Sequence, residues 1–353
     1  MRAHAELLGF GLAGAAFACA HFKRARPAEL LIVDPASTLK QQRSLSFFET
    51  GEHLFSRCVS HRWRQARVIS AAGQTQQIAL PWPYARMCAS DVYDFAREQL
   101  PRSVEWLAAA PEDLSPALQL DSRPILFKPL LLQHFEGFDV SADRDCFDPD
   151  CVTLMDFSVS QSTDAIHFCY VLPWDRRHAL VEDTYISAPE WPRPDYRGEC
   201  EQWLATRFPN ARFALRLSES GRLPMDSYPP LGGGSGVSVD IGARGGFLRA
   251  STGYSTADTL RAAQLYANSS ALSEPALLRA QLKKLRPRLS TWMDRVFLRA
   301  LCATPAQGPA LFTTLFKRAA AQRLIPFLNG TAGFFDHLAV IRALPPMPLL
   351  RSL

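Results

Sequence analysis

Three glycines near the start of the chain constrain its fold more than any other feature. Gly9, Gly11 and Gly14 form the pattern G-x-G-x-x-G, between a short apolar run and a helix-compatible segment. A second apolar run follows and ends in Asp34, twenty residues after Gly14. In dinucleotide-binding folds, such glycines let the backbone approach a pyrophosphate at a helix N-terminus, and an acid at this spacing binds the ribose hydroxyls. The order therefore predicts a Rossmann-like unit in which these four residues bind the cofactor.

The same stretch also has features of a secretory signal peptide. Arg2 precedes an apolar run over 7–17, and Ala18-Cys19-Ala20 is typical of a cleavage site. A glycine fingerprint alone would be weak evidence against this alternative. We favour the nucleotide-binding unit because strand, glycines, helix, second strand and acid follow in the expected order. Beyond this stretch, no run reaches the roughly 18 apolar residues of a membrane span.

Composition and charge exclude several classes of protein. Hydrophobic residues make up 47% of the 353 residues and charged residues 21%, which excludes a disordered or collagen-like chain. The net charge of +5 is too small to require a nucleic acid as partner. However, residues 271–353 contain 12 Lys and Arg against 3 Asp and Glu. A basic, apolar C-terminal part without interleaved aromatic and basic residues predicts contact with an anionic membrane surface, and no nucleic-acid partner.

The cysteines and histidines show no pattern of a metal site. The eight Cys contain no C-x-x-C pair, and the eight His contain no H-E-x-x-H motif and no close cluster. Eight dispersed thiols in a chain of this length are typical of buried thiols in a reducing compartment. We therefore expect no metal, and a cytoplasmic protein that is peripherally associated with a membrane.

Periodicity predicts β-structure in the middle of the chain and helices toward its end. Helices are expected over 90–100, 196–207 and 254–271, and from 273 onward as amphipathic helices, one of them over 311–324. Strands are expected in a hairpin over 66–80 and over 151–161, 167–172, 179–185 and 237–242. This order favours a nucleotide-binding fold that is interrupted by β-rich insertions and capped by helices.

Several segments along the chain resemble one enzyme family. The most specific are Tyr170-Val171-Leu172-Pro173 and Val181-Glu182-Asp183-Thr184-Tyr185. The others are Ser60-His61-Arg62-Trp63, Met155-Asp156 with Gln161, Gly242-Ala243-Arg244, Thr252-Gly253-Tyr254-Ser255 and Pro346-Met347-Pro348-Leu349-Leu350. Together they resemble the bacterial flavin-dependent lycopene cyclases, which close β-rings on the ends of lycopene. The segments are collinear over most of the chain, which chance spacing would not give.

The resemblance implies an α/β fold like that of the flavoprotein hydroxylases. A Rossmann-like FAD-binding domain would be interleaved with a β-sheet substrate domain and followed by a helical C-terminal part. The expected boundaries are 1–60, 86–120 and 225–272 for the FAD-binding domain, 61–85 and 121–224 for the β-rich substrate domain, and 273–353 for the helical, basic, membrane-facing part.

The resemblance also implies a cofactor and residues that bind it. The cofactor would be FAD in its reduced form, with NAD(P)H as the electron source and no net redox change in the reaction. The implied binding residues, besides the N-terminal glycines and acid, are Gly242, Arg244, Thr252, Gly253 and Tyr254. The amides of 252–254 precede a predicted helix and would face a flavin ring or a phosphate. Arg244 would approach the flavin or anchor its own loop.

Three segments depart from the family pattern. Ser44-Leu45-Ser46-Phe47-Phe48 stands where the family usually has Trp-Ser-Phe-His, and Arg249-Ala250 replaces the usual His-Pro. The tract 101–150 matches poorly. These departures leave open a relative that binds flavin or carotenoid but has lost its acid chemistry.

Ring closure on a polyene begins when an unactivated alkene is protonated. This reaction needs a carboxylic acid kept protonated by an apolar site, aromatic faces that stabilise a carbocation, and exclusion of water. Glu182 and Asp183 are adjacent carboxyl groups in an apolar strand and are the candidate catalytic residues. Because side chains alternate along a strand, the two cannot face one carbon without a bulge. We predict Glu182, on the face of Leu180 and Thr184, as the acid, and Asp183 as a residue that fixes the hairpin or the flavin.

Alternatives remain for these and other residues. Glu182 and Asp183 would be ordinary surface acids if they faced solvent and paired with Arg176 or Arg177. Asp156 is either a second acid or, as we favour, a hydrogen-bonded structural aspartate. Ser60-His61-Arg62-Trp63 is more typical of local packing than of catalysis.

The sequence thus predicts an FAD-dependent carotenoid cyclase, a lycopene beta-cyclase. It would convert lycopene end groups to β-ionone rings, giving γ- or β-carotene by a redox-neutral, acid-initiated reaction. Two alternatives stay open: a flavin monooxygenase acting on a lipophilic substrate, and a catalytically inactive relative that binds flavin or carotenoid.

Overall fold

The computed structural model describes residues 4–24, 28–35, 43–110, 115–271 and 274–345. Its strands are β1 (His4–Leu8), β2 (Glu29–Val33), β3 (Ser44–Phe48), β4 (Val59–Ile69), β5 (Thr75–Cys88), β6 (Glu105–Leu107), β7 (Leu118–Asp121), β8 (Leu131–Ala142), β9 (Cys151–Asp156), β10 (Ala165–Pro173), β11 (His178–Ser187), β12 (Phe213–Met225) and β13 (Ser238–Asp240). Its α-helices are α1 (Leu12–Phe22), α2 (Ala89–Gln99), α3 (Tyr196–Arg207), α4 (Thr256–Ala267), α5 (Pro275–Leu282), α6 (Arg288–Ala303), α7 (Gly308–Arg318), α8 (Ala321–Leu328) and α9 (Phe334–Ala343).

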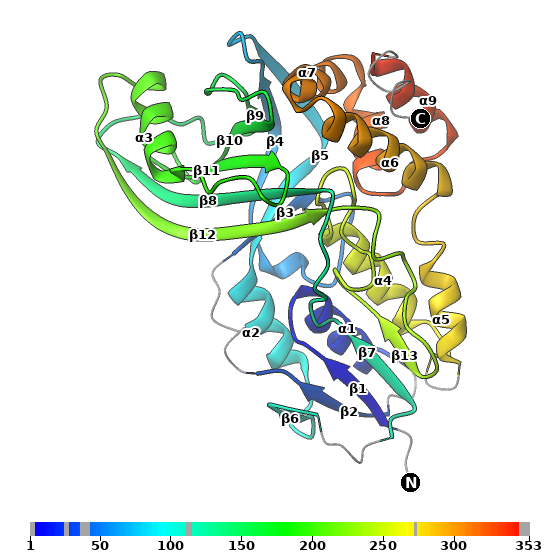
Figure 1. Ribbon diagram of the computed structural model, residues 1–353. Helices are drawn as coiled ribbons and strands as arrows, with labels where there is room; N and C mark the ends of the chain where they lie inside the picture. The colour runs from blue at the N-terminus through cyan, green and yellow to red at the C-terminus, as the bar shows by residue number, and fades with distance from the viewer. Residues whose placement is uncertain (1–3, 25–27, 36–42, 111–114, 272–273, 346–353) are drawn as a thin grey trace.

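The first sheet has five parallel strands in the order β13-β7-β1-β2-β6. Helix α1 connects β1 to β2 and packs against α2 and α4 (Figure 1). Small and apolar residues cover all sides of α1, and its segment 13–21 is buried throughout. A helix that is apolar on every side must lie inside the molecule. The parallel unit β1-α1-β2 is the Rossmann-like arrangement that the glycine pattern predicts.

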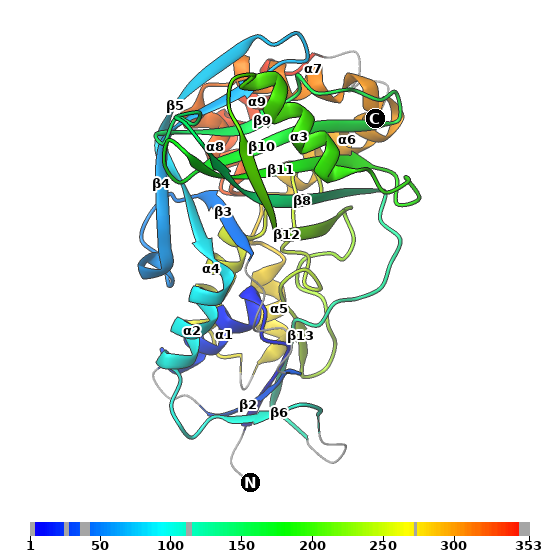
Figure 2. The same cartoon turned by 90° about the vertical axis from the view of Figure 1, so that its left-hand side faces the viewer.

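The second sheet has eight strands in the order β12-β8-β11-β10-β9-β4-β5-β3. Its neighbouring strands are antiparallel, except for the parallel pair β4 and β9. Helix α3 covers one face of this sheet, and the C-terminal helices α6–α9 cover the other (Figures 1 and 2). Because both faces are covered, β10 and β11 are buried along nearly their whole length.

Most of the expected elements are present. The hairpin β4-β5 turns at Gly73, which has a positive φ of 77°, and β10 pairs with β11 as expected. Two expectations on length were wrong. The strand predicted over 151–161 ends at Asp156, and the helix predicted over 311–324 is two helices, because Ala319 and Ala320 have extended backbones.

Five strands were missed by the sequence analysis: β6, β7, β8, β3 and β12. The first three lie in the tract 101–150, which also matches the family pattern poorly. Strand β12 contains Gly221 and Pro224, which are both unfavourable in strands. The expected domain boundaries remain predictions, because the two sheets assign strands and not the limits of domains. No helix in the described part of the chain is both long enough and apolar enough to cross a membrane.

Candidate functional site

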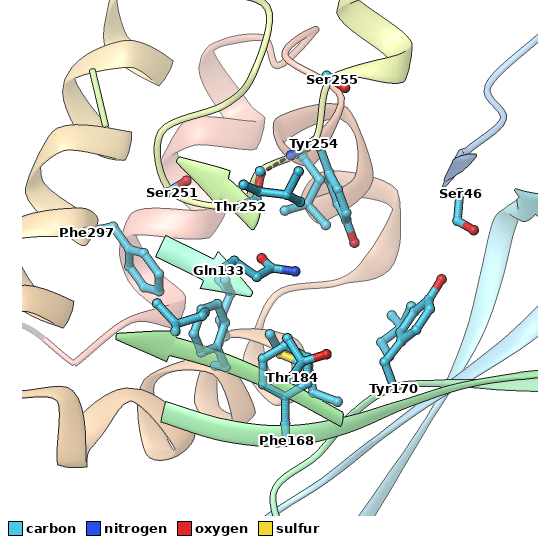
Figure 3. A pocket seen from close by; sticks show the side chains of 18 of the residues that line it. Ser46, Gln133, Phe168, Tyr170, Thr184, Ser251, Thr252, Tyr254, Ser255 and Phe297 are labelled. Carbon is cyan, nitrogen blue, oxygen red and sulfur yellow. Dashed lines mark hydrogen bonds between the residues drawn. The ribbon is translucent and has the colours of Figure 1, made fainter. Parts of the chain in front are cut away.

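A cavity of about 480 Å³ lies between the eight-stranded sheet and the C-terminal helices. Its size is within the range of cavities that bind small molecules. Helices α6–α9 and the segment 251–256, which leads into α4, complete its walls. Figure 3 shows side chains from the sheet and from segment 251–255 directed into the same space. The lining is mostly apolar and aromatic, with a small polar group formed by Arg43, Ser46, Tyr84, Gln133, Tyr170, Glu182, Thr184, Glu219, Thr252 and Tyr254.

The two adjacent acids of β11 lie on opposite faces of the sheet. Glu182 lines the cavity together with Thr184, as strand alternation predicts. Asp183 lies on the face that α3 covers and is fully buried. The alternative of two solvent-facing acids is therefore wrong. Arg176 and Arg177, the partners that it requires, pair with Asp145 instead.

Glu182 is a carboxyl group in an apolar environment. Its side chain is 7% exposed. Burial raises the pKa of Glu182 well above its ordinary value, and the nearby carboxyl group of Glu219 raises this pKa further. Both effects favour the neutral acid over the carboxylate, and the neutral acid is the state that a proton donor needs.

Asp183 does not line the cavity, so as a candidate catalytic residue it requires a correction. Its Oδ1 lies 2.6 Å from Nε2 of His167, whose Nδ1 lies 2.8 Å from the carbonyl oxygen of Ser160. Burial raises the pKa of Asp183, whereas the hydrogen bond to His167 opposes that shift. Alternation along β11 explains the placement, because Asp183 must face away from Glu182. Its contacts fit the expected role in holding the hairpin.

Three tyrosines line the cavity beside Glu182. Tyr170 is opposite Glu182 in the pairing of β10 with β11, and its hydroxyl donates a hydrogen bond of 3.1 Å to the Tyr84 hydroxyl. Burial raises the pKa of Tyr254 to about 12 and raises the pKa values of Tyr84 and Tyr170 well above their ordinary value. The tyrosines are therefore neutral. In Figure 3, Tyr170 projects into the cavity from the sheet, and Tyr254 projects into it from the segment before α4.

The N-terminal glycines form a close-packed turn between β1 and α1. Gly9 has a φ of 88°, which favours glycine, and a Cβ on Gly14 would lie 2.2 Å from the Gly9 carbonyl oxygen. At Gly11, by contrast, a Cβ would meet no atom of the described chain within 4 Å. No side chain caps the first turn of α1 in the described structure, and no acid lies in that turn. The turn thus leaves open space beside uncapped helix amides, which fits the pyrophosphate of a dinucleotide such as FAD.

The loop at Gly242, which was also predicted to bind the cofactor, lies beside the glycine turn between β1 and α1. Gly242 has a φ of 63°, and a Cβ there would lie 2.9 Å from the Cβ of Ala13 in α1. Ser122, which follows β7, donates hydrogen bonds of 2.9 and 3.0 Å to the carbonyl oxygens of Leu8 and Gly9. Segments far apart in sequence therefore meet at the carboxyl ends of β1, β7 and β13, where open α/β sheets bind ligands.

The two charged residues predicted at this site make contacts within the protein. The Asp34 carboxylate accepts a hydrogen bond of 2.6 Å from the backbone N–H of Phe10, so it holds the glycine turn. Arg244 lies 2.9 Å from Asp240 and 3.3 Å from Asp121. These ion pairs match the predicted alternative in which Arg244 anchors its own loop.

Segment 252–254 contributes side chains to the cavity wall, and the turn itself uses the backbone amides of Thr252 and Gly253. The backbone N–H groups of Thr252 and Gly253 both donate to the carbonyl oxygen of Arg249, at 3.4 and 2.9 Å. The expectation that these amides face a flavin or phosphate is therefore wrong for both residues. The tight turn uses them internally, and the side chains of Thr252 and Tyr254 line the cavity instead.

The departures from the family pattern are accommodated by packing. Leu45 lines the cavity, and Phe48 is buried with its ring centroid 4.9 Å from that of Tyr84. Arg249 is 1% exposed, and its Nε donates a hydrogen bond of 3.1 Å to Asp294 of α6. Its guanidinium also donates to the carbonyl oxygen of Phe327 and lies 4.6 Å from the centroid of that ring. Arg249 therefore joins the cavity segment to α6 and α8.

The remaining residues of interest have structural roles. Asp156 is fully buried and accepts hydrogen bonds from Ser158 and from the indole of Trp203, as the structural interpretation expects. The indole of Trp63 donates to the carbonyl oxygen of Pro173, and His61 stacks on Trp63 at 5.6 Å.

Glu219 is an acid of the cavity wall that the sequence analysis missed. It lies in β12 and is 8% exposed. The pairing of β12 with β8 shifts between Leu217 and Glu219, so one residue of β12 is extra at this point. Such a bulge re-aims the side chains that follow it. Alternation of polar and apolar residues in β12 was the only signal available, and it does not show the bulge.

Comparisons with known proteins agree with this architecture. A geranylgeranyl bacteriochlorophyll reductase-like protein from Thermoplasma acidophilum superposes with a TM-score of 0.65 at 10% identity, over 99% of this chain and 98% of that chain. Klebsiella pneumoniae HpxO, complexed with FAD and uric acid, has a TM-score of 0.57 at 13% identity over 96% and 97% of the two chains. An oxygenase acting on 2-methyl-3-hydroxypyridine-5-carboxylic acid has a TM-score of 0.54 at 13% identity, over 90% and 96%. At these identities the likeness shows the fold alone, and it confirms the flavoprotein hydroxylase-like α/β class.

The family follows from the sequence. No curated protein matches this chain. A family model described as lycopene cyclase protein, however, matches residues 113–353, well over half of the chain. The chain therefore belongs to the lycopene cyclase protein family.

Proposed function

We propose that this protein is an FAD-dependent lycopene beta-cyclase that closes β-ionone rings on lycopene end groups without net redox change. The observation that carries this proposal is the position of Glu182, a buried acid with a raised pKa at the wall of a mainly apolar cavity. An apolar polyene end needs an apolar cavity, and protonation of its alkene needs a neutral acid. Membership of the lycopene cyclase protein family supports the same reaction.

The proposed reaction starts when Glu182 transfers its proton to the terminal double bond of the substrate. A tertiary carbocation forms, the neighbouring double bond attacks it, and loss of a proton from the new ring restores a double bond. The aromatic rings around the cavity, among them Phe168, Tyr170 and Tyr254, stabilise the cation without capturing it. The apolar walls from α6–α9 exclude water, which would trap the cation as an alcohol.

The glycine turn of β1 and α1, with the loop at Gly242, would hold the FAD. The fold neighbour HpxO was solved with FAD, which supports the same cofactor in this fold. Reduced FAD, formed with NAD(P)H as electron source, would supply negative charge that stabilises the carbocation. Asp34 would hold the turn and face the ribose side of the site, and Gly11 would let the pyrophosphate approach the backbone.

Coexpression in cells that accumulate lycopene tests the proposed function. The expected result is a new pigment with one or two β-rings and no added oxygen, identified by chromatography and mass spectrometry. An oxygenated product would instead support a flavin monooxygenase. Unchanged lycopene together with a flavin-bound protein would support an inactive relative. Either of these results would contradict the proposal.

Flavin binding is expected to depend on the open space at Gly11. The purified protein should show the visible absorption bands of FAD. Gly11→Val would place a side chain where the pyrophosphate is expected, so FAD affinity should fall at least about tenfold, which corresponds to about 1.4 kcal/mol. Gly51→Val is the matched control, because a Cβ there also meets no atom within 4 Å but Gly51 follows β3, a strand of the other sheet. Equal FAD affinity in the two variants would contradict this placement of the cofactor.

We further propose that α6 and α9 bring the cavity to a membrane. Hydroxyl Oγ of Ser290 in α6 lies 2.7 Å from Nε2 of His337 in α9, so the two helices are in contact. Large apolar side chains are exposed on both helices, and we call them the α6–α9 apolar face: Leu289, Trp292, Phe334, Phe335 and Ile341. Two of them, Trp292 and Ile341, also line the cavity. Exposed arginines on the same helices, including Arg288, Arg295 and Arg342, suit anionic headgroups.

Vesicle binding tests the α6–α9 apolar face. The protein is expected to sediment with anionic phospholipid vesicles, and Phe334→Ser with Phe335→Ser should weaken this binding at least tenfold, because each buried Phe contributes about 1.5–3 kcal/mol. Leu217→Ser is the control, since Leu217 is 55% exposed but lies on β12. A Leu217 variant that loses as much binding as the double variant would show that this face is not the contact.

A further inference from the structure

Glu182 has a neighbouring carboxyl group that comes from a different strand. Strand β8 lies between β11 and β12, and Gly137 of β8 is paired with Glu182 on one side and with Glu219 on the other. Residues directly opposite in neighbouring strands point to the same face of a sheet. The two glutamates therefore flank one glycine on the face of the cavity, and both line the cavity.

Gly137 leaves the space in which the two side chains approach each other. A Cβ on Gly137 would lie 3.0 Å from Cγ of Glu219 and 3.1 Å from Cγ of Glu182. Both distances are shorter than nearly all real contacts of a Cβ atom. The Cγ atoms of the two glutamates thus occupy the space above Gly137, one from each neighbouring strand. The register shift in β12 is what places Glu219 opposite Gly137.

The two carboxyl groups have different environments. Oε2 of Glu219 accepts a hydrogen bond of 2.6 Å from the backbone N–H of Ser44, at the start of β3. This hydrogen bond fixes the position of the Glu219 carboxyl group. The two residues are almost equally buried, at 7% and 8% exposed, and the charge of Glu219 is one cause of the raised pKa of Glu182. The two carboxyl groups thus differ in their surroundings: the Ser44 amide holds Glu219, and the neighbouring Glu219 favours the protonated form of Glu182.

On the basis of the proposed function, we propose that Glu219 is the positioning residue for the acid: it shares one proton with Glu182 across Gly137 and keeps that proton on Glu182 until the substrate takes it. When Glu182 gives its proton to the alkene, a carbon–hydrogen bond forms and the pair is left with two negative charges. Two adjacent carboxylates repel each other. The pair therefore takes up the proton that leaves the new ring, and it returns to its starting state with atoms and electrons balanced.

The pH profile separates this role from a merely structural one. Other titratable groups that line the same cavity are Tyr170 from β10, Tyr84 from β5, Tyr254 before α4 and Arg43 before β3. Glu219→Gln leaves all of these in place and removes the repulsion that holds the Glu182 proton. Activity of the wild type should fall as pH rises through the pKa of Glu182. In Glu219→Gln this fall should begin at least one pH unit lower, and kcat at neutral pH should drop at least tenfold, with KM changed less than threefold.

Two further variants make the test decisive. Glu136→Gln is the matched control, because Glu136 neighbours Gly137 in β8 but is paired with Asp183 on the opposite face and forms an ion pair with Arg193. It should leave the pH profile unchanged. Gly137→Ala keeps every charge but forces the glutamates apart, so it should also lower kcat at least tenfold. It provides the readout if Glu219→Gln does not fold.

The outcomes distinguish this inference from the proposed function. A wild-type protein that forms no rings contradicts the proposed function itself. An active wild type combined with an unshifted pH profile in Glu219→Gln, or with unchanged kcat in Gly137→Ala, overturns the role of Glu219 while leaving the function intact.

Discussion

Glu182→Gln is expected to lose ring formation while keeping FAD bound. The amide fills nearly the same volume but has no acidic proton to give, and general acid catalysis typically contributes about 10²- to 10⁴-fold to a rate. We therefore expect kcat to fall by about that factor, to little or no detectable product. The measurement is pigment analysis in lycopene-accumulating cells, together with the visible spectrum of the purified variant.

Asp183→Asn is the matched control for this prediction. It makes the same chemical change one residue away, but on the face that α3 covers, where the carboxyl group contacts His167. The variant should be less stable and should still form rings in proportion to the folded protein. Ring formation that survives Glu182→Gln but not Asp183→Asn would exclude Glu182 as the proton donor.

Arg249→Met is expected to destabilise the protein strongly. The change removes one partner of a buried ion pair and leaves Asp294, which is 2% exposed, with Ser251 as its remaining hydrogen-bond donor of this cluster. Breaking a buried pair in this way costs about 3–5 kcal/mol. Denaturant unfolding followed by fluorescence would measure the free energy of unfolding.

A double variant tests whether the unpaired charge of Asp294 causes the loss of stability. Arg249→Met with Asp294→Leu removes both charges, and apolar replacement of a whole buried pair is often close to neutral. The double variant should therefore be more stable than Arg249→Met alone. An Arg249→Met protein within about 1 kcal/mol of the wild type would contradict the buried ion pair, because surface changes have effects of that size.

The local parts of the fold could be predicted from the sequence. Gly9, Gly11 and Gly14 followed by Asp34 predicted the β1-α1-β2 unit, since each residue serves a turn or contact within thirty residues. The opposite orientations of Glu182 and Asp183 follow from strand alternation alone. Both features depend on short-range geometry, which a single sequence records.

The parts of the site that the sequence did not predict depend on contacts between segments far apart in the chain. Glu219 enters the cavity because a bulge in β12 re-aims it, and Gly137 meets both glutamates because β8 lies between their strands. Neither the bulge nor the strand order has a local sequence signal. Arg249 was similarly seen only as a departure from the family, because its partner Asp294 is 45 residues away in α6.

Ring formation in D₂O tests most directly that a solvent-exchangeable acid starts the reaction. The purified, FAD-loaded protein would be equilibrated in D₂O, supplied with lycopene in lipid vesicles, and the product examined by mass spectrometry. Transfer of the exchangeable proton of Glu182 to the alkene predicts one deuterium gained for each ring formed. A cyclic product that carries no deuterium, or a product that has gained oxygen instead, would contradict this account.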